Sequence, residues 1–265
     1  MGIGDDLMWL AQAQQQFART GRCVRPTHKG STYAWGRRLW LREAYDNQPC
    51  IDAVHGENLE EKPHGRRPYQ YDPRYRPSPA QIILTTAEIQ WAQDHMPKGP
   101  YVIINPDAKQ GGIHHNNKHW HHPYWQQLAL QLAQRGIVTV RLKPVTRMDT
   151  YYPACNIETD SIRKVMACIR TAAWVITTDG AAHHIAAAWH TPCTVIWGTC
   201  TSPYATPTRG ALGYEGQHNL IVKHPLTPCY TEKRECDHCV KSKQTITPQC
   251  VIDTLDITKI KAHGR

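Results

Sequence analysis

The chain has 265 residues, and 31 Lys and Arg against 22 Asp and Glu give it a formal net charge of +9. This length can bury a core without disulfides, no apolar run approaches the length of a membrane-spanning helix, and the first residues do not resemble a signal peptide. These features exclude a small disulfide scaffold and an integral membrane protein. We expect a soluble, cytoplasmic protein whose substrate or partner is anionic.

The amino-terminal third mixes helical and irregular patterns. A glycine turn over residues 1–6 leads into a helix predicted over residues 7–19, which Gly21 ends. Residues 55–79 are rich in Pro, Arg and Tyr, and this composition predicts a loop or linker. Its arginines, among them Arg66 and Arg67, interleave with tyrosines and could bind a phosphate or stack on a base. The alternative is a solvated basic loop.

From residue 85 onward, helical and strand patterns alternate. Thr85 and Glu88 form a capping box that begins a helix. The spacing of apolar residues then predicts strands at 101–104, 137–142, 174–176 and 193–197, and helices at 123–134, 161–173 and 181–189. The order β-α-β-α-β-α-β predicts an α/β protein with a doubly wound parallel sheet.

The stretch of residues 175–203 has the features of an anion-binding site. Its first strand ends in Thr177-Thr178-Asp179-Gly180 and opens directly into a helix at Ala181. Backbone N–H groups and the positive end of the helix dipole meet at such a point, where a phosphate can bind. The alternative is an ordinary βαβ unit with no ligand.

Four further side chains are candidates for chemistry. Lys118 precedes a helix and follows a strand that ends at the same sheet edge as the strand before Asp179. It could neutralise a diphosphate there or lie solvated on the surface. Asp179 could hold a ribose hydroxyl or cap the helix. His184, like its neighbour His183, could donate to a phosphate or lie buried with a satisfied partner. Asp5 could be a general base or an N-cap.

The tail has four cysteines, two of which form a CxxC pair. They could bind structural zinc or pack as reduced thiols: Cys229, Cys236, Cys239 and Cys250. The chain has no Walker loop, GxGxxG, HExxH or serine elbow, which argues against an NTPase, a dehydrogenase, a zinc protease and an ordinary hydrolase.

Three blocks, taken in order, resemble the heptosyltransferase-like family 9 glycosyltransferases. They are the opening GIGDDLM, the pair IINPDA and NNKHWHHPYWQQLALQLAQRG, and TDGAAHHIAAAWHTP; the Cys-containing tail is also similar. The resemblance implies a GT-B-like fold with two Rossmann-like domains, parallel sheets and an interdomain cleft. Because the chain begins on the glycine turn where relatives have a strand, we expect a reduced acceptor domain over residues 1–98. A nucleotide-sugar-binding domain would span residues 99–265.

The resemblance also implies the activity, which is metal-independent transfer of a sugar from a nucleotide-sugar, with no cofactor required. Asp5 would deprotonate the acceptor hydroxyl and Lys118 would contact the donor diphosphate. The other residues implied for the donor site are Asp179, Gly180, Ala181, His184, Asn105 and Asp107. Gly180 and Ala181 stand where the family has Thr and Gly, so we expect a different donor preference.

The acceptor is expected to be anionic, either a phosphorylated saccharide of a cell-surface glycan or a hydroxylated base of DNA. Arg66 and Arg67 are the candidate residues for binding it. The alternative function is a non-catalytic nucleotide-binding or nucleic-acid-binding protein derived from the same fold.

Overall fold

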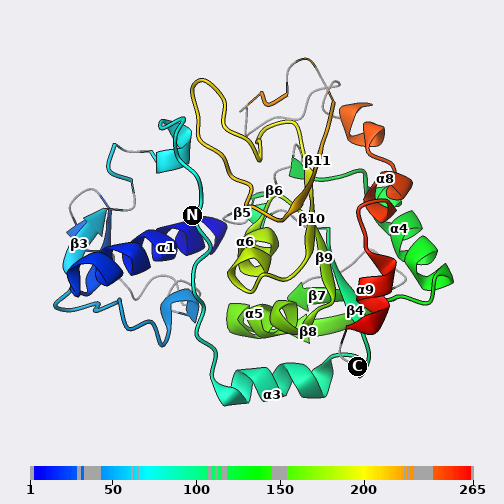
Figure 1. Cartoon of the computed structure of the whole chain (residues 1–265), viewed down its shortest axis with the longest axis horizontal. Helices are drawn as coiled ribbons and strands as arrows, with labels where there is room; N and C mark the ends of the chain where they lie inside the picture. Colours follow the sequence, from blue (N-terminus) through cyan, green and yellow to red (C-terminus); the bar gives the residue numbers. More distant parts are fainter. Residues whose placement is uncertain are drawn as a thin grey trace.

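A six-stranded parallel sheet forms the centre of the computed structural model, which describes residues 3–28, 31–32, 43–60, 62–64, 66–106, 109–110, 113–114, 118–144, 154–223, 225, 227–229 and 241–263. The strands are β4 (Tyr101–Asn105), β7 (Val138–Pro144), β8 (Cys155–Thr159), β9 (Trp174–Thr178), β10 (Cys193–Trp197) and β11 (His218–Ile221). They lie in the order β11-β10-β9-β4-β7-β8, and every neighbouring pair is parallel (Figure 1). This is the strand order of a Rossmann sheet. The predicted α/β class with a doubly wound parallel sheet is confirmed.

Helices cover both faces of this sheet. On one face lie α5 (Ile162–Thr171) and α6 (Ala181–Ala188), and on the other α4 (His122–Gln134), α8 (Pro248–Ile252) and α9 (Ile257–Ala262) (Figure 1). Alternate side chains of a strand point to opposite faces. In β4, Tyr101 and Ile103 therefore join the apolar cluster under α5 and α6, whereas Val102 and Ile104 join the cluster under α4 and α8.

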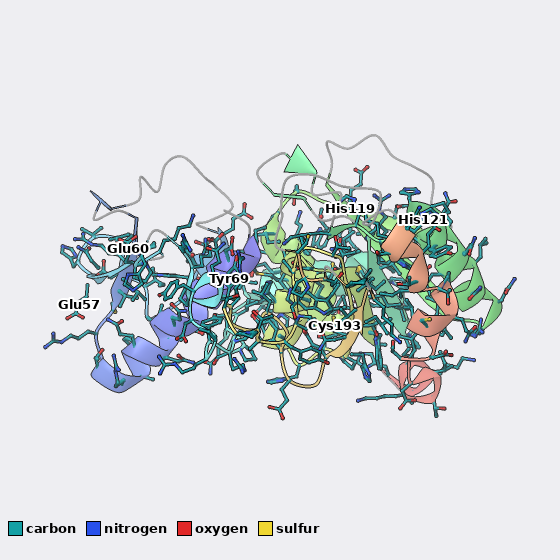
Figure 2. All side chains as sticks on the ribbon, turned by 90° about the horizontal axis from the view of Figure 1, so that it is seen from above. Glu57, Glu60, Tyr69, His119, His121 and Cys193 are labelled. Atoms are coloured by element: carbon teal, nitrogen blue, oxygen red, sulfur yellow. The ribbon has the colours of Figure 1, made fainter. Side chains whose placement is uncertain are left out.

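The amino-terminal part packs beside the first of these clusters. It contains α1 (Ile3–Thr20), α3 (Thr86–His95), and a small sheet of order β2-β1-β3, formed by β2 (Ser31–Thr32), β1 (Val24–His28) and β3 (Glu57–Glu60). Figure 2 shows Glu57 and Glu60 toward one end of the molecule, His121 toward the other, and Tyr69 between them. The apolar face of α1 joins the cluster that lies under α5 and α6, so both parts of the chain share this core.

The remaining elements are short. A two-stranded antiparallel sheet pairs β5 (Lys109–Gln110) with β6 (Ile113–His114). The 3₁₀ turns are η2 (Pro68–Gln70) and η4 (Lys243–Thr245). Within the described part of the chain, none of the helices combines the length and the apolar composition that a bilayer crossing requires.

Several predictions from the sequence are corrected. Residues 3–6 form the first turn of α1 and not a glycine turn, because the carboxylates of Asp5 and Asp6 suit the positive end of a helix. The strand β3 lies inside the predicted loop 55–79, because pairing with β1 outweighs its polar composition. The edge strands β8 and β11 were not predicted. The boundary at residue 98 stays a prediction.

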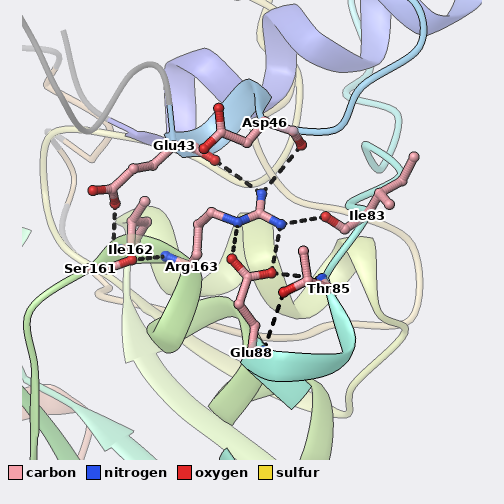
Figure 3. Close-up of polar contacts among 8 residues, drawn as sticks. All are labelled: Glu43, Asp46, Ile83, Thr85, Glu88, Ser161, Ile162 and Arg163. Atoms are coloured by element: carbon pink, nitrogen blue, oxygen red, sulfur yellow. Dashed lines mark hydrogen bonds and ion pairs between the residues drawn. The ribbon is translucent and has the colours of Figure 1, made fainter. Parts of the chain in front are cut away.

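Arg163, near the start of α5, joins three amino-terminal segments to the Rossmann sheet (Figure 3). Its side chain is 5% exposed. The guanidinium forms a bidentate pair with the Glu88 carboxylate, with Nη2 2.8 Å from Oε2. It also donates to the backbone carbonyls of Glu43, Asp46 and Ile83. One buried guanidinium therefore provides hydrogen-bond donors for a carboxylate and three carbonyls that lie far from it in the sequence.

We predict that Arg163→Met lowers the free energy of unfolding by about 3 kcal/mol, because it leaves a carboxylate and three carbonyls without their donor. Urea denaturation measures this change. The matched control is Arg74→Met, since the Arg74 side chain is 93% exposed and its ion pair is with the nearby surface residue Asp72; we expect it to stay within about 0.5 kcal/mol of the wild type. Equal stability of the two variants would contradict the role assigned to Arg163.

Gly4 lies where the start of α1 meets α6. A Cβ built on Gly4 would lie 2.6 Å from Nε2 of His184, a separation that real Cβ atoms essentially never show. The His184 ring is 4% exposed and held by its neighbours, so it has little room to move. Glycine at this position therefore lets the start of α1 reach the first turns of α6.

We predict that Gly4→Ala destabilises the protein by about 1–3 kcal/mol through overpacking. The direction of the change in stability is informative, because helix propensity alone would make the Ala variant more stable by about 1 kcal/mol. Thermal unfolding of Gly4→Ala and of the control Gly99→Ala, whose added Cβ meets nothing within 4 Å, makes the comparison. A Gly4→Ala variant that is more stable than the wild type would show that the two helices do not meet in this way.

Candidate donor and base site at the strand ends

Polar residues gather where β4 and β9 end, side by side in the sheet. The strand order reverses between these two strands, and ligands of open α/β sheets bind at such a switch point. Asn105 ends β4 and its Nδ2 donates to Thr177 Oγ1 over 3.2 Å, while Asp179 follows β9 directly. The topology therefore brings together Asn105 and Asp179, as the sequence predicted.

Lys118 and Asp179 form an ion pair at this edge. Lys118 Nζ lies 2.8 Å from Asp179 Oδ2, and their side chains are 19% and 5% exposed. Burial raises the pKa of Asp179, but the charge of Lys118 and the contact with His183 outweigh it, so the pKa lies well below its ordinary value. Burial likewise lowers the pKa of Lys118. The charge of Asp179 outweighs this effect, with smaller contributions from Cys200 and Asp5, so the pKa of Lys118 is raised. Both groups are charged at neutral pH.

The helix α6 begins without a side-chain cap from its N-cap residue. Its N-cap is Gly180, which makes no side-chain cap hydrogen bond, and Ala181 is its first residue. Asp179 therefore pairs with Lys118 instead of capping the helix. The first N–H groups of such a helix are available to an anion, which the helix dipole also favours. Gly180 has an extended backbone, and a Cβ there would meet only the Thr178 carbonyl at 3.9 Å.

Both histidines of α6 are buried beside this pair. His183 Nε2 lies 3.4 Å from Asp179 Oδ1. His184 Nδ1 lies 2.7 Å from the hydroxyl of Tyr214, which the sequence analysis did not single out. Burial is the main reason that the pKa of His184 lies well below its ordinary value, so its imidazole is neutral at physiological pH. No motif marks Tyr214 in the sequence.

Asp5 lies in the first turn of α1 and is gripped by the segment that contains η2. Arg67 Nε is 3.1 Å from Asp5 Oδ1, and Arg67 Nη1 donates to the Asp5 carbonyl over 3.2 Å. The Tyr69 hydroxyl donates to the same carboxylate over 3.4 Å. Arg67 is buried, whereas Arg66 is exposed. Of the two predicted acceptor-binding arginines, Arg67 therefore contacts Asp5, and Arg66 faces solvent.

Three of the predicted site residues lie outside the described part of the chain: Asp107, Cys236 and Cys239. The other two tail cysteines are partly buried. The backbone N–H of Cys229 donates to the Thr199 carbonyl, in the turn after β10, and Cys250 lies on α8. Zinc binding by the tail cysteines stays a prediction.

Asp179, His183 and His184 offer atoms within 4.8 Å of one another, which is close enough to suggest metal ligands. Asp179 already holds the Lys118 ammonium at 2.8 Å, so a divalent cation there would meet a buried like charge. His184 Nδ1 is also engaged by Tyr214. Asp179 Oδ2 and His184 Nδ1 are therefore engaged by other protein groups, which disfavours a divalent metal ion at this trio.

Comparison with solved structures supports the fold. A glycosyl transferase family 9 protein from Veillonella parvula DSM 2008 is 12% identical, with a TM-score of 0.69 over 98% of this chain and 95% of that one. The iron-containing dodecameric glycosyltransferase TibC from enterotoxigenic E. coli H10407 is 13% identical, with a TM-score of 0.64 over 98% and 73%. The E. coli ADP-heptose lps heptosyltransferase II is 20% identical, with a TM-score of 0.49 over 68% of this chain and only 53% of its own length.

Comparison at the level of sequence families is more direct. None of the curated proteins matches the chain significantly. The family model described as glycosyltransferase family 9 (heptosyltransferase) matches residues 69–241, which include Lys118, Asp179 and His184 but not Asp5. More than half of the chain lies within this match, and the chain belongs to glycosyltransferase family 9.

Proposed function

We propose that this protein transfers a sugar from a nucleotide-sugar to a hydroxyl group of an acceptor. The observation that carries the proposal is the largely buried Lys118–Asp179 pair beside the start of α6, where the N-cap is a glycine. An ammonium has three donors, and Asp179 engages one of them, so others can bind a donor diphosphate. The lysine and the backbone N–H groups would then stabilise the negative charge that develops on the departing diphosphate.

Asp5 is the proposed general base. It stands at the start of α1, and its charge contributes to the raised pKa of Lys118, so the two groups act within one electrostatic neighbourhood. The Asp5 carboxylate would take the proton of the acceptor hydroxyl as that oxygen attacks the anomeric carbon. The bond from this carbon to the diphosphate breaks, and the electron pair leaves with the diphosphate. Arg67 and Tyr69 would hold the carboxylate in position.

Further donor contacts are proposed from the same arrangement. Asp179, Gly180, Ala181 and His184 would line the nucleotide site, with Asn105 beside it. Asp107, outside the described residues, is proposed for this site from the family resemblance alone. The reaction would need no metal, because Lys118 and the helix dipole supply the positive charge that a cation supplies in other transferases.

We propose an anionic saccharide as the acceptor. The segment that contacts Asp5 continues into exposed basic side chains, including Arg66, Arg74 and Arg76. These arginines flank Arg67 and Tyr69, which contact Asp5, and they could attract a phosphate or carboxylate of the acceptor. Binding to single-stranded and duplex DNA over a salt series tests the alternative: saturable binding with a steep salt dependence would favour a nucleic acid.

We predict that Asp5→Asn lowers kcat by at least about 100-fold, as expected for loss of a general base, and leaves donor affinity nearly unchanged. The control is Asp94→Asn, at an exposed carboxylate on α3 that accepts a hydrogen bond from Gln90 of the same helix. Calorimetry gives the affinity, and release of nucleoside diphosphate gives the rate. Normal turnover of Asp5→Asn would exclude this base.

We predict that Lys118→Met weakens binding of the nucleoside diphosphate by about 10-fold to 100-fold, since a charge-assisted hydrogen bond contributes about 1.5–3 kcal/mol. A thermal-shift panel of ADP, GDP, UDP and their sugars first identifies the ligand. ADP-heptose belongs in it, as the donor named for the E. coli heptosyltransferase II. Lys98→Met, at an exposed lysine, is the control. Unchanged affinity in Lys118→Met would contradict the proposed donor site.

Transfer should also survive removal of divalent cations. We expect the rate to be unchanged after treatment with EDTA and desalting, and to show no increase when Mg²⁺ or Fe²⁺ is restored. A loss of transfer that a metal reverses, with the fold intact by circular dichroism, would show that the chemistry depends on a cation.

A further inference from the structure

We propose that Tyr214 is a positioning residue that fixes His184 as the Nε2–H tautomer, so that this N–H can donate to the leaving diphosphate. The inference rests on the proposed function for the identity of the ligand. The first claim, that His184 is the Nε2–H tautomer, does not depend on any ligand and can be tested on the protein alone.

The contact itself is short and buried. The Tyr214 hydroxyl lies 2.7 Å from His184 Nδ1, and the two residues are 6% and 4% exposed. The rings meet edge to face, with centroids 5.5 Å apart and planes at 89°. A ring nitrogen of His184 also lies within 4.8 Å of the Asp179 carboxylate, so the imidazole borders the Lys118–Asp179 pair.

Hydrogen-bond accounting decides which atom is the donor. The imidazole is neutral and carries one proton, and burial keeps the proton on the phenol by raising its pKa. Among the described residues, His184 Nδ1 is the only acceptor within reach of the Tyr214 hydroxyl. If Nδ1 carried the proton, the buried phenol O–H would have no acceptor, which is costly. The phenol therefore donates to Nδ1, and the proton of the imidazole lies on Nε2.

Nε2 faces the start of α1. The Cβ that Gly4 lacks would lie 2.6 Å from this atom, so the Nε2 edge of the ring is turned toward the backbone next to Asp5. A donor on this edge lies where the start of α1 meets the first turn of α6, beside the proposed diphosphate site. With the other tautomer, a lone pair would face the phosphate and repel it.

Tyr214 is held firmly enough to act in this way. Its backbone N–H donates to Gln217 Oε1 over 3.3 Å, and Gln217 Nε2 donates to the His183 carbonyl over 2.8 Å. Gln217 thus ties the Tyr214 backbone to α6 itself. Before it, Gly213 packs so closely against Pro203 that a Cβ would lie 2.7 Å from the proline ring.

The test compares Tyr214→Phe with Tyr204→Phe. Tyr204 is 59% exposed in the same connection, so its variant also removes a phenol hydroxyl but should behave like the wild type. In the wild type, ¹⁵N NMR of the histidine rings should show His184 as the Nε2–H tautomer, and Tyr214→Phe should lose this preference. Tyr214→Phe should also bind the nucleoside diphosphate about tenfold more weakly, within the range for residues that orient a ligating histidine, and lower kcat.

The outcomes separate the inference from the proposed function. The Nδ1–H tautomer in the wild type would overturn the inference, as would unchanged diphosphate affinity in Tyr214→Phe. If the wild type transfers no sugar with any donor yet shows the expected tautomer and affinity loss, the proposed transfer fails and the role of Tyr214 stands. His184→Ala should bind the diphosphate as weakly as Tyr214→Phe, and combining the two changes should add nothing.

Discussion

The ion pair between Lys118 and Asp179 is the interaction on which the rest of the site depends. The buried Asp179 carboxylate and the partly buried Lys118 ammonium lose part of their hydration, and a close partner of opposite charge offsets that loss. The pair therefore holds the lysine, which follows β4 along the chain, at the end of β9. It fixes a positive charge at the switch point of the sheet, next to the start of α6. Without Asp179, no nearby negative charge of this pair would compensate Lys118 for its lost hydration, and the partly buried position of the lysine would be destabilised.

Helix packing brings Asp5, the proposed base, toward the positive charge of Lys118. The start of α1 lies against α6 because Gly4 leaves room for His184. Arg67 and Tyr69 hold the Asp5 carboxylate from the side of η2. The same segment rests on the connection that carries Tyr214, since Gly210 donates to the Tyr69 carbonyl. The base, the histidine and its tyrosine partner thus belong to one connected set of packed residues. Arg163 supports this arrangement by binding the amino-terminal part to α5.

The sequence predicted the sheet where its strands are buried on both faces. β9 and β10 consist of fully buried residues, and their apolar runs are visible without a structure. The edge strand β8 is largely exposed, β11 is mostly half-buried, and both mix polar with apolar residues, so they carry no such signal. The first turn of α1 was also missed, because glycine has a poor helix propensity and its packing against His184 cannot be inferred from local sequence.

The candidate site was predictable in part for a similar reason. Topology alone places the ends of β4 and β9 side by side, which brings Asn105 and Asp179 together. The partners of these residues depend on side-chain packing between distant segments. Arg67 was predicted to bind an acceptor, and its contact with Asp5, 62 positions away in the chain, could not be inferred from the sequence. Tyr214 stands 30 positions beyond His184 in a stretch with no periodic pattern, and no local signal could have selected it.

A double-mutant cycle on diphosphate binding tests the central claim most directly. Calorimetry would compare the wild type, Lys118→Met, Asp179→Asn and the double variant, each checked for native circular dichroism. If Asp179 acts by holding Lys118 for the diphosphate, each single change weakens binding and the double variant binds no more weakly than Lys118→Met alone. Losses that add in full would show that the two residues act independently, and affinity that none of the changes alters would show that the diphosphate binds elsewhere.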